Sequence, residues 1–327
     1  MKHIVCSGCS FTRQWKRLNI DGNDTNFLED TSNFWRWPHW IQKIYGNKFK
    51  VYNLGSPTND NSTIKKSVFY KVNKLLKSGI DSKDIIVLVQ WSNYHRNSFY
   101  IDKNKMEHFN SYLPKNSEEI KDRISKSKCE PLNVFAHISD YIEEKNQNGE
   151  FGYYLLTGGY NYDHIAYDVK NLISNYVNNF YSDEESLIRF FDNIISLQSF
   201  LDKLNISHLS FNIQNNFVLN QPELVEDSQN WKKSVYFDKW LPSTIQNENQ
   251  YNNPYIQHLY ELVNLENFWF LNSEETSKGG LVEWAIKNYN VNYKFPLYME
   301  ENVPVGHISS EMNKLFVEKE LKDFLNV

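Results

Sequence analysis

Short runs of apolar residues alternate along the chain with longer stretches in which apolar residues recur every three or four positions. Five of the short runs have the length of buried β-strands. The clearest of them, IIVLVQW at 85–91, is almost continuously apolar, as expected for a parallel strand that is covered on both faces. The predicted strands are residues 3–9, 49–54, 84–91, 206–213 and 268–271.

The stretches with helical spacing predict helices between these strands. The first helix begins near Trp37, because Pro38 fits only in the first turn of a helix. The last helix has Ser309 as a good N-cap, with Met312 at the third helical position. The predicted helices are residues 37–45, 62–76, 184–204, 281–289 and from Ser309 or Ser310 to about 325.

Strands that alternate with helices predict an α/β fold. Right-handed crossovers then give a three-layer α/β/α arrangement with a five-stranded, mostly parallel, flavodoxin-like sheet in the order 2-1-3-4-5. Two polar stretches, about 97–182 and 214–266, interrupt the alternation, and we interpret them as insertions in a single domain covering 1–327. Helices are expected around 133–144 and 163–180, and a loop at 306–307.

Composition narrows the classes of function. The chain has 327 residues, of which 40% are hydrophobic and 16% aromatic, so it can bury a large core although its mean hydropathy is −0.62. The net charge is −5 and no basic run is longer than a pair, which disfavours a broad phosphate-binding face. We therefore expect no nucleic-acid partner.

Cysteine usage and hydropathy bear on the compartment. Three cysteines do not make a disulfide framework, and no histidine cluster has the spacing of a metal site, so we expect neither cofactor nor metal. No apolar run reaches the length of a membrane span, and the first run is a single strand rather than a signal peptide. We expect a protein that is cytoplasmic when made, has no membrane partner, and can assemble into a larger particle such as a virion.

Polar residues follow several of the predicted strands. Ser10 comes after the first strand and its Gly8, the stretch 55–61 follows the second, and Ser92 and Asn93 follow the third. Because ligands of parallel α/β sheets bind at the carboxyl ends of the strands, these residues are expected to share one edge. A serine that follows a strand and a glycine there is a candidate nucleophile.

The order of these segments resembles that of the SGNH (GDSL-like) hydrolases, as a divergent member. Four blocks carry the resemblance, GCSFT at 8–12, NLGSPT at 53–58, QWSN at 90–93 and VPVGHISSE at 303–311. They correspond to the family's nucleophile turn, glycine turn, asparagine turn and histidine segment. An ordinary α/β-hydrolase fits less well, because its nucleophile turn has the pattern Gly-x-Ser-x-Gly, and this chain has Thr12 at the position of the second glycine.

The resemblance implies acyl-ester hydrolysis. Ser10 would attack the ester carbonyl, and His307 would take the serine proton and return it to the leaving alcohol. The oxyanion would be held by the Ser10 amide, the Gly55 amide and the side chain of Asn93. If the third block is aligned strictly with the family's asparagine turn, the side chain of Ser92 takes the place of that of Asn93.

The chain departs from the family's pattern beside the histidine. The family's aspartate would stand at about position 304, which is a proline here. Glu301 or Glu300 could supply the orienting acid instead. Otherwise a backbone carbonyl would orient the imidazole of His307, and Ser10 and His307 would act as a dyad.

We interpret the chain as a serine esterase acting on a small acylated substrate, an O-acetylated carbohydrate being the favoured class. The sugar is suggested by the family and by aromatic residues at 231–251, although packing onto the sheet is the more common role for such residues. The alternative is a catalytically silent SGNH-fold protein with a structural or carbohydrate-binding role, as in a phage virion. The missing aspartate favours that alternative.

Overall fold

The structure is a computed structural model, and it describes most of the predicted strands and helices. The described residues are 1–9, 11–12, 35–55, 59–94, 96, 98–101, 135–137, 153–156, 179–215, 217, 253–271, 278–288, 297–300 and 303–326. For 98–101, 135–137, 153–156, 286, 297–300 and 303–307 the structure describes only the backbone. The predicted helix at 163–180 and the aromatic residues at 231–251 lie almost entirely outside the described part.

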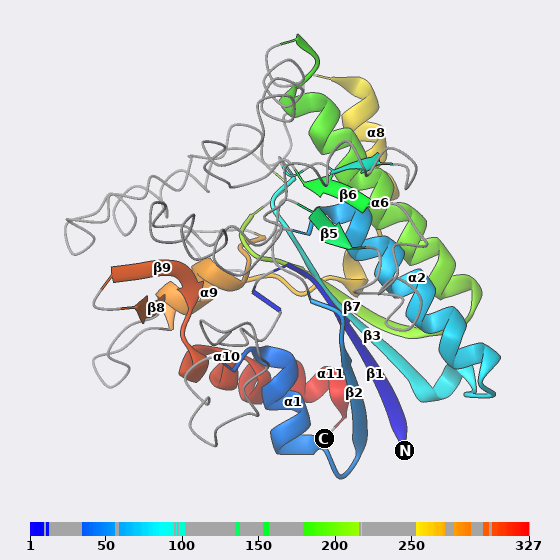
Figure 1. The fold of residues 1–327 in the computed structure, drawn as a ribbon, viewed down its shortest axis with the longest axis vertical. Coiled ribbons are helices and arrows are strands. Elements are labelled where there is room, and N and C mark those ends of the chain that lie inside the picture. Colours follow the sequence, from blue (N-terminus) through cyan, green and yellow to red (C-terminus); the bar gives the residue numbers. More distant parts are fainter. Residues whose placement is uncertain are drawn as a thin grey trace, which may run out of the picture.

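A parallel sheet of four strands, in the order β2-β1-β3-β7, forms the centre of the described structure (Figure 1). Its register places Ile4 between Val51 and Ile86, and Leu88 beside Leu209. The prediction of an α/β fold with a parallel sheet is confirmed, and the order agrees with the first four positions of the predicted one. The strands are β1 Lys2–Ser7, β2 Phe49–Asn53, β3 Ile85–Trp91 and β7 Ser207–Asn212.

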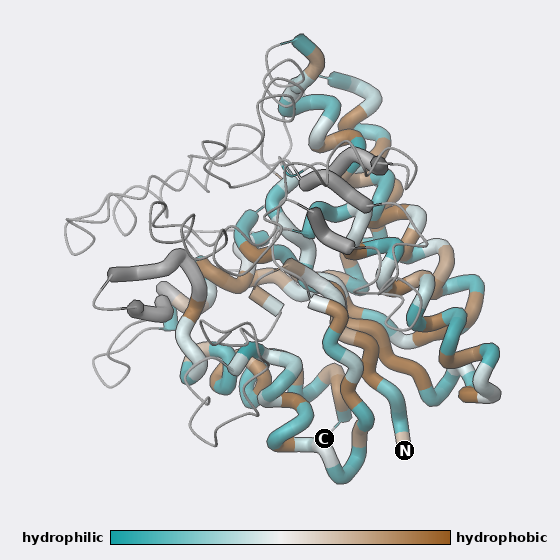
Figure 2. Tube along the Cα trace, viewed as in Figure 1, coloured by the Kyte–Doolittle hydropathy of each residue, from teal (hydrophilic) through white to brown (hydrophobic). Residues whose placement is uncertain are grey.

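Helices cover both faces of this sheet, because alternate residues of each strand point to opposite sides. Ile4 and Leu88 pack in a core with α1 and α10, whereas Val5 and Val87 pack in a second core with α2 and α6. Figure 2 shows the hydrophobic central strands between helices that carry hydrophilic residues outward. The helices are α1 Trp37–Tyr45, α2 Asn61–Lys77, α6 Asp183–Lys203, α8 Pro254–Leu262, α9 Leu281–Lys287, α10 Ser310–Phe316 and α11 Lys322–Leu325.

The predicted helix boundaries hold to within about two residues where they can be compared. Pro38 lies in the first turn of α1, and the Ser309 hydroxyl caps α10 by accepting a hydrogen bond from the Met312 amide at 3.3 Å. A π-helical turn, Val317–Leu321, joins α10 to α11. Two 3₁₀ turns, Ser82–Asp84 and Leu265–Asn267, precede β3 and the predicted fifth strand.

The predicted fifth strand does not form as a strand. Residues 268–271 make one parallel bridge, between Phe268 and Ser210 of β7, and the Trp269 amide donates to the Ser210 carbonyl at 2.8 Å. Leu271 instead pairs antiparallel with Gly279, so the pairing of this run with β7 is limited to one bridge. The run still alternates, since Phe268 packs in the α2 and α6 core and Leu271 in the other, and this explains its strand-like pattern.

Two further predictions inside irregular regions are wrong. Residues 135–137 form a strand rather than part of a helix, within a three-stranded antiparallel sheet ordered β4-β6-β5. Its partners are far apart in sequence, so the pairing leaves no local signal. Residues 306–307 belong to strand β9 rather than a loop, and β9 pairs with β8. Pro304 is tolerated in β9 although it has no N–H to donate, because a two-stranded hairpin leaves one edge of each strand unpaired. These strands are β4 Ser98–Ile101, β5 Phe135–His137, β6 Tyr153–Leu156, β8 Leu297–Glu300 and β9 Val303–Ile308.

Candidate functional site

The turn after β1 is packed closely against the end of β3. A Cβ atom added to Gly8 would lie 2.1 Å from Thr12 Oγ1 and 2.9 Å from Gln90 Oε1, so only glycine fits. The Thr12 hydroxyl donates to Gln90 Oε1 at 3.1 Å, and the Thr12 amide donates to the Cys9 carbonyl at 2.9 Å. The glycine predicted to permit a sharp turn is therefore required by close approach of side chains.

Ser10, the predicted nucleophile, lies outside the described residues. Its neighbours on both sides are described, and Cys9 and Phe11 are buried. The Cys9 thiol donates to Gln90 Oε1 at 3.4 Å, so the residue before Ser10 and Thr12 after it share one acceptor. Gln90 is the one polar residue in the apolar run 85–91. This local signal of a role in the turn was not used in the sequence predictions.

The turn after β2 is joined to the turn after β1 by Asn53. Its Nδ2 donates to the Thr12 carbonyl at 2.9 Å, and its Oδ1 accepts from the Gly55 amide at 2.9 Å. Gly55 was predicted to offer that amide to an oxyanion. An incoming oxyanion would therefore have to displace the Asn53 side chain from the Gly55 amide.

Two asparagines at the start of α2 hold the other turns. Asn59 Nδ2 donates to the Gly8 carbonyl at 3.1 Å. Asn61 Oδ1 accepts from the Ser92 amide at 2.8 Å, while its Nδ2 donates to the carbonyls of Ser92 and Asn93 at 3.2 and 3.4 Å. The turns after β1, β2 and β3 are therefore one hydrogen-bonded unit at the carboxyl edge of the sheet.

Ser92 and Asn93, the alternative oxyanion donors, lie in this unit. Ser92 is fully buried and Asn93 is half-buried. Asp60 fixes the adjacent end of α2, because its carboxylate accepts from the Thr63 amide at 2.9 Å. Sequence reasoning placed Gly55, Ser92 and Asn93 at this edge, but it missed the asparagines that hold them.

The segment that carries His307 reaches the same region through α1. The carbonyl of Ile308, the next residue, accepts from Arg36 Nη1 at 2.8 Å. Trp37, next to Arg36, donates its indole N–H to Thr12 Oγ1 at 3.3 Å. Asn313 strengthens the junction, since its Oδ1 accepts from the Trp37 amide at 3.0 Å and its Nδ2 donates to the Ile308 carbonyl at 3.3 Å.

Backbone pairing also locates one candidate for the orienting acid. Glu300 is paired with Val303, and Leu297 with Ile308, so Glu300 and His307 lie at different levels of the hairpin. Glu301 lies outside the described residues, as does the side chain of His307.

One buried carboxyl group lies just beyond the carboxyl end of β7. Glu283 Oε1 accepts from the Asn215 amide at 2.9 Å, and Oε2 accepts from the Gly280 amide at 3.0 Å. Burial raises the pKa of Glu283 to about 7, against the opposing effect of these amide donors. This carboxyl group joins the turn after β7 to the start of α9.

Another shifted group flanks the α1 junction. The pKa of His39 is lowered to about 4, first by burial and then by the charge of Arg36. Among the described residues, no set of three His, Cys, Asp or Glu side chains could hold a metal ion.

Comparisons with known proteins gave no match for this chain among protein-family models, curated proteins or solved structures. In the described part of the chain no helix combines the length and apolar character needed to cross a membrane.

Proposed function

We propose that the chain is an SGNH-type serine esterase that hydrolyses a small acyl ester, with an O-acetylated carbohydrate as the substrate class. Ser10 is the nucleophile, His307 the general base and acid, and the turn at Ser92 and Asn93 contributes to the oxyanion hole. No cofactor takes part. We also propose that the chain is a three-layer, flavodoxin-like domain with insertions at about 97–182 and 214–266. In this architecture residues 268–271 occupy the fifth position of the sheet, beside β7, without forming a regular strand.

One observation carries the proposal. Arg36 and Trp37 link the segment beside Ser10 to the segment beside His307. Arg36 donates a hydrogen bond of 2.8 Å to the Ile308 carbonyl, and Trp37 donates one of 3.3 Å to the Thr12 hydroxyl. Two segments almost 300 positions apart in sequence thus converge on the carboxyl edge, where parallel α/β sheets carry their sites. A nucleophile and base must share such an edge before one can activate the other.

Hydrolysis of p-nitrophenyl acetate and of an acetylated sugar tests the proposal. Ser10→Ala and His307→Ala should each lower kcat/KM by at least about a thousandfold, because each removes a group that acts on the reacting atoms. Ser78→Ala and His258→Ala are matched controls, since both positions are exposed and neither residue belongs to the hydrogen-bonded turns after β1, β2 and β3. Wild-type protein that is inactive on both esters, or Ser10→Ala that retains full activity, would contradict the proposal.

Two further variants separate a triad from a dyad. A large loss of activity in Glu301→Gln or in Glu300→Gln identifies the acid that orients His307. Mild effects in both favour a dyad in which a backbone carbonyl orients the imidazole.

A catalytically silent protein with a structural or carbohydrate-binding role is the second candidate. The bond between the Gly55 amide and Asn53 Oδ1 favours it, because that amide is already engaged within the chain. The proline at position 304, where the family has its aspartate, favours it as well. Sugar binding without ester hydrolysis is the outcome that this candidate predicts.

A further inference from the structure

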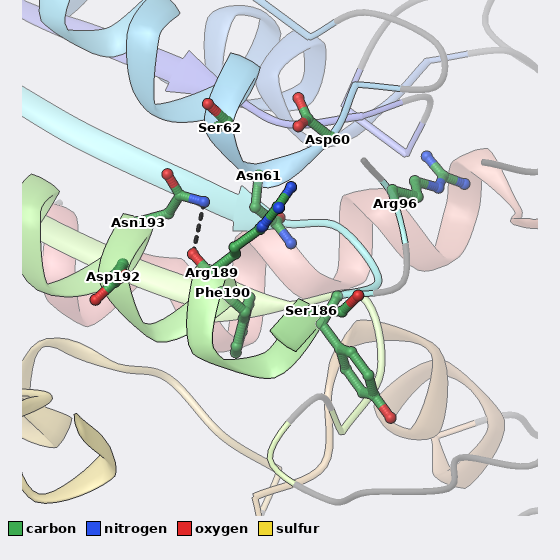
Figure 3. Close-up of a pocket in the computed structure, with 10 residues that line it drawn as sticks. Asp60, Asn61, Ser62, Arg96, Ser186, Arg189, Phe190, Asp192 and Asn193 are labelled. Carbon is green, nitrogen blue, oxygen red and sulfur yellow. Dashed lines mark hydrogen bonds between the residues drawn. The ribbon is translucent and has the colours of Figure 1, made fainter. Parts of the chain in front are cut away.

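A cavity of about 250 Å³ lies between α2 and α6, beside the turn that follows β3 (Figure 3). Its volume is below the roughly 300–1,000 Å³ of pockets that take drug-sized ligands, so it suits one small ring. Asn61 forms part of its wall and also holds Ser92 and Asn93, so the cavity adjoins the proposed oxyanion turn.

The lining balances hydrogen-bond donors against acceptors. Arg96 and Arg189 supply cationic N–H donors, while Asp60 and Asp192 supply carboxylate acceptors. Two carboxylates in so small a space oppose a phosphate or carboxylate ligand by like-charge repulsion. A sugar hydroxyl both donates and accepts, so it can use both kinds of group.

Two aromatic rings complete the lining. Tyr94, just after the oxyanion turn, and Phe190 on α6 border the cavity from within the core, and with 2% and 1% exposure they present little ring surface to it. A neighbouring polar side chain is held in place, because Asn193 Nδ2 donates to the Arg189 carbonyl at 2.7 Å, as Figure 3 shows. Polar groups beside a small apolar area suit the hydroxyl rim of a sugar ring, and no stacking on its C–H face is required.

One cationic donor of a lining residue lacks an acceptor among the described residues. Arg96 is half-buried, its Nη1 atom is inaccessible to solvent, and this atom has no hydrogen-bond partner among the described residues. A buried donor without a partner destabilises the fold, so its presence needs a reason. Because Nη1 is covered in the free protein, a ligand oxygen in the cavity would supply the missing acceptor once the Arg96 side chain turns this atom toward it.

We propose that this cavity binds one neutral sugar ring and is the carbohydrate subsite of the esterase. Its place in a reaction rests on the proposed function, whereas sugar binding itself does not. The sugar hydroxyls accept from Arg96 and Arg189 and donate to Asp60 and Asp192, and the acetyl ester extends toward the turn at Ser92.

Binding to the full chain tests the subsite by saturation-transfer NMR and calorimetry. The probes are the methyl glycosides of glucose, galactose and N-acetylglucosamine, with glucuronic acid and inorganic phosphate as anionic probes. At least one neutral glycoside should bind, and Arg96→Met and Arg189→Met should each weaken it at least tenfold. Lys203→Met is the matched control, because it removes the same charge from the exposed far end of α6.

Thermal unfolding of the free protein gives a second readout. Arg96→Met should not lower the unfolding midpoint, because it removes a buried donor that has no acceptor. A lowered midpoint, together with unchanged glycoside binding, would assign Arg96 to the fold alone and overturn the proposal. Binding of glucuronic acid or phosphate alone, or of no probe, would also overturn it.

Hydrolysis of p-nitrophenyl acetate separates this proposal from the previous one, because that ester has no sugar. Turnover without glycoside binding refutes only the subsite. Glycoside binding without turnover refutes only the esterase and leaves the subsite as a binding site.

Discussion

The two faces of the central sheet use their buried polar groups differently. On the face covered by α1 and α10, hydrogen bonds of Arg36, Trp37 and Asn313 join α1 to α10 and to the turn at Thr12, although His39 Nδ1 on α1 is buried with no partner among the described residues. On the face covered by α2 and α6, the lining of a cavity includes an Arg96 donor that has no partner in the part of the chain that the structure describes. The first arrangement fixes the geometry of the proposed site, and the second leaves room for a ligand.

This difference follows from what each kind of contact contributes. A buried network in which donors and acceptors are paired holds its members rigidly, because every displacement exposes an unpaired group. A group left without a partner stabilises nothing until a ligand supplies one. Substitutions on the first face should therefore lower stability, whereas substitutions around the cavity should lower binding.

The largest effect is expected at the junction of the turns after β1 and β3. Gly8→Ala should lower the free energy of unfolding by about 4 kcal/mol, because the new Cβ overpacks the turn and breaks the bond from Thr12 to Gln90. Urea unfolding measures this. Gly79→Ala is the control, since Gly79 has φ of 88° but nothing within 4 Å of an added Cβ, so only backbone strain of about 1 kcal/mol is expected. Equal losses in the two variants would contradict the packing that we describe.

Glu283 should make stability depend on pH. Its pKa is about 7 in the folded protein and 4.5 without the fold's influence, so the folded state binds the proton more tightly. The free energy of unfolding should therefore fall as pH rises from 4.5 to 7 and then level off, by up to about 3 kcal/mol from this group.

Urea unfolding between pH 4.5 and 8 tests this dependence. Glu283→Gln should flatten the profile, because the titrating group is gone. Glu311→Gln, at an exposed position on α10, should leave the wild-type slope. A Glu283→Gln profile as steep as that of the wild type would show that this carboxyl group is not responsible.

A pair of asparagines compares the two faces directly. Asn313→Ala should lower the free energy of unfolding by about 2 kcal/mol, because the buried Trp37 amide loses its acceptor. Asn193→Ala should cost under about 1 kcal/mol, since its Nδ2 bonds to a carbonyl inside α6, but it should weaken glycoside binding. The same loss of stability in both variants would remove the distinction between the faces.

The sequence predicts elements whose signals are local. The apolar run of β3 and the cap at Ser309 are of this kind, and both are confirmed. The pairing of β5 with β6 and of β8 with β9 depends on partners elsewhere in the chain, so neither 135–137 nor 306–307 was expected to be a strand. Residues 268–271 have the pattern of a strand but follow β7 for only one bridge.

The candidate site divides in the same way. Glycine and serine after a strand are visible as a motif, so Gly8, Gly55 and Ser92 could be assigned to the carboxyl edge. The groups that hold this edge could not, because Gln90 and Asn61 act on residues in other turns. A glutamine as the next-to-last residue of an apolar strand is the one local hint of such a role.

The most direct test of the central claim is covalent labelling of the wild-type chain with a fluorophosphonate, followed by mass spectrometry of its peptides. The label should lie on Ser10, because a serine beside a general base attacks phosphorus as it would an ester carbonyl. The label should be lost in His307→Ala and kept in His258→Ala. An unlabelled wild type, or a label on another serine that persists in Ser10→Ala, would contradict a nucleophile at the carboxyl end of β1.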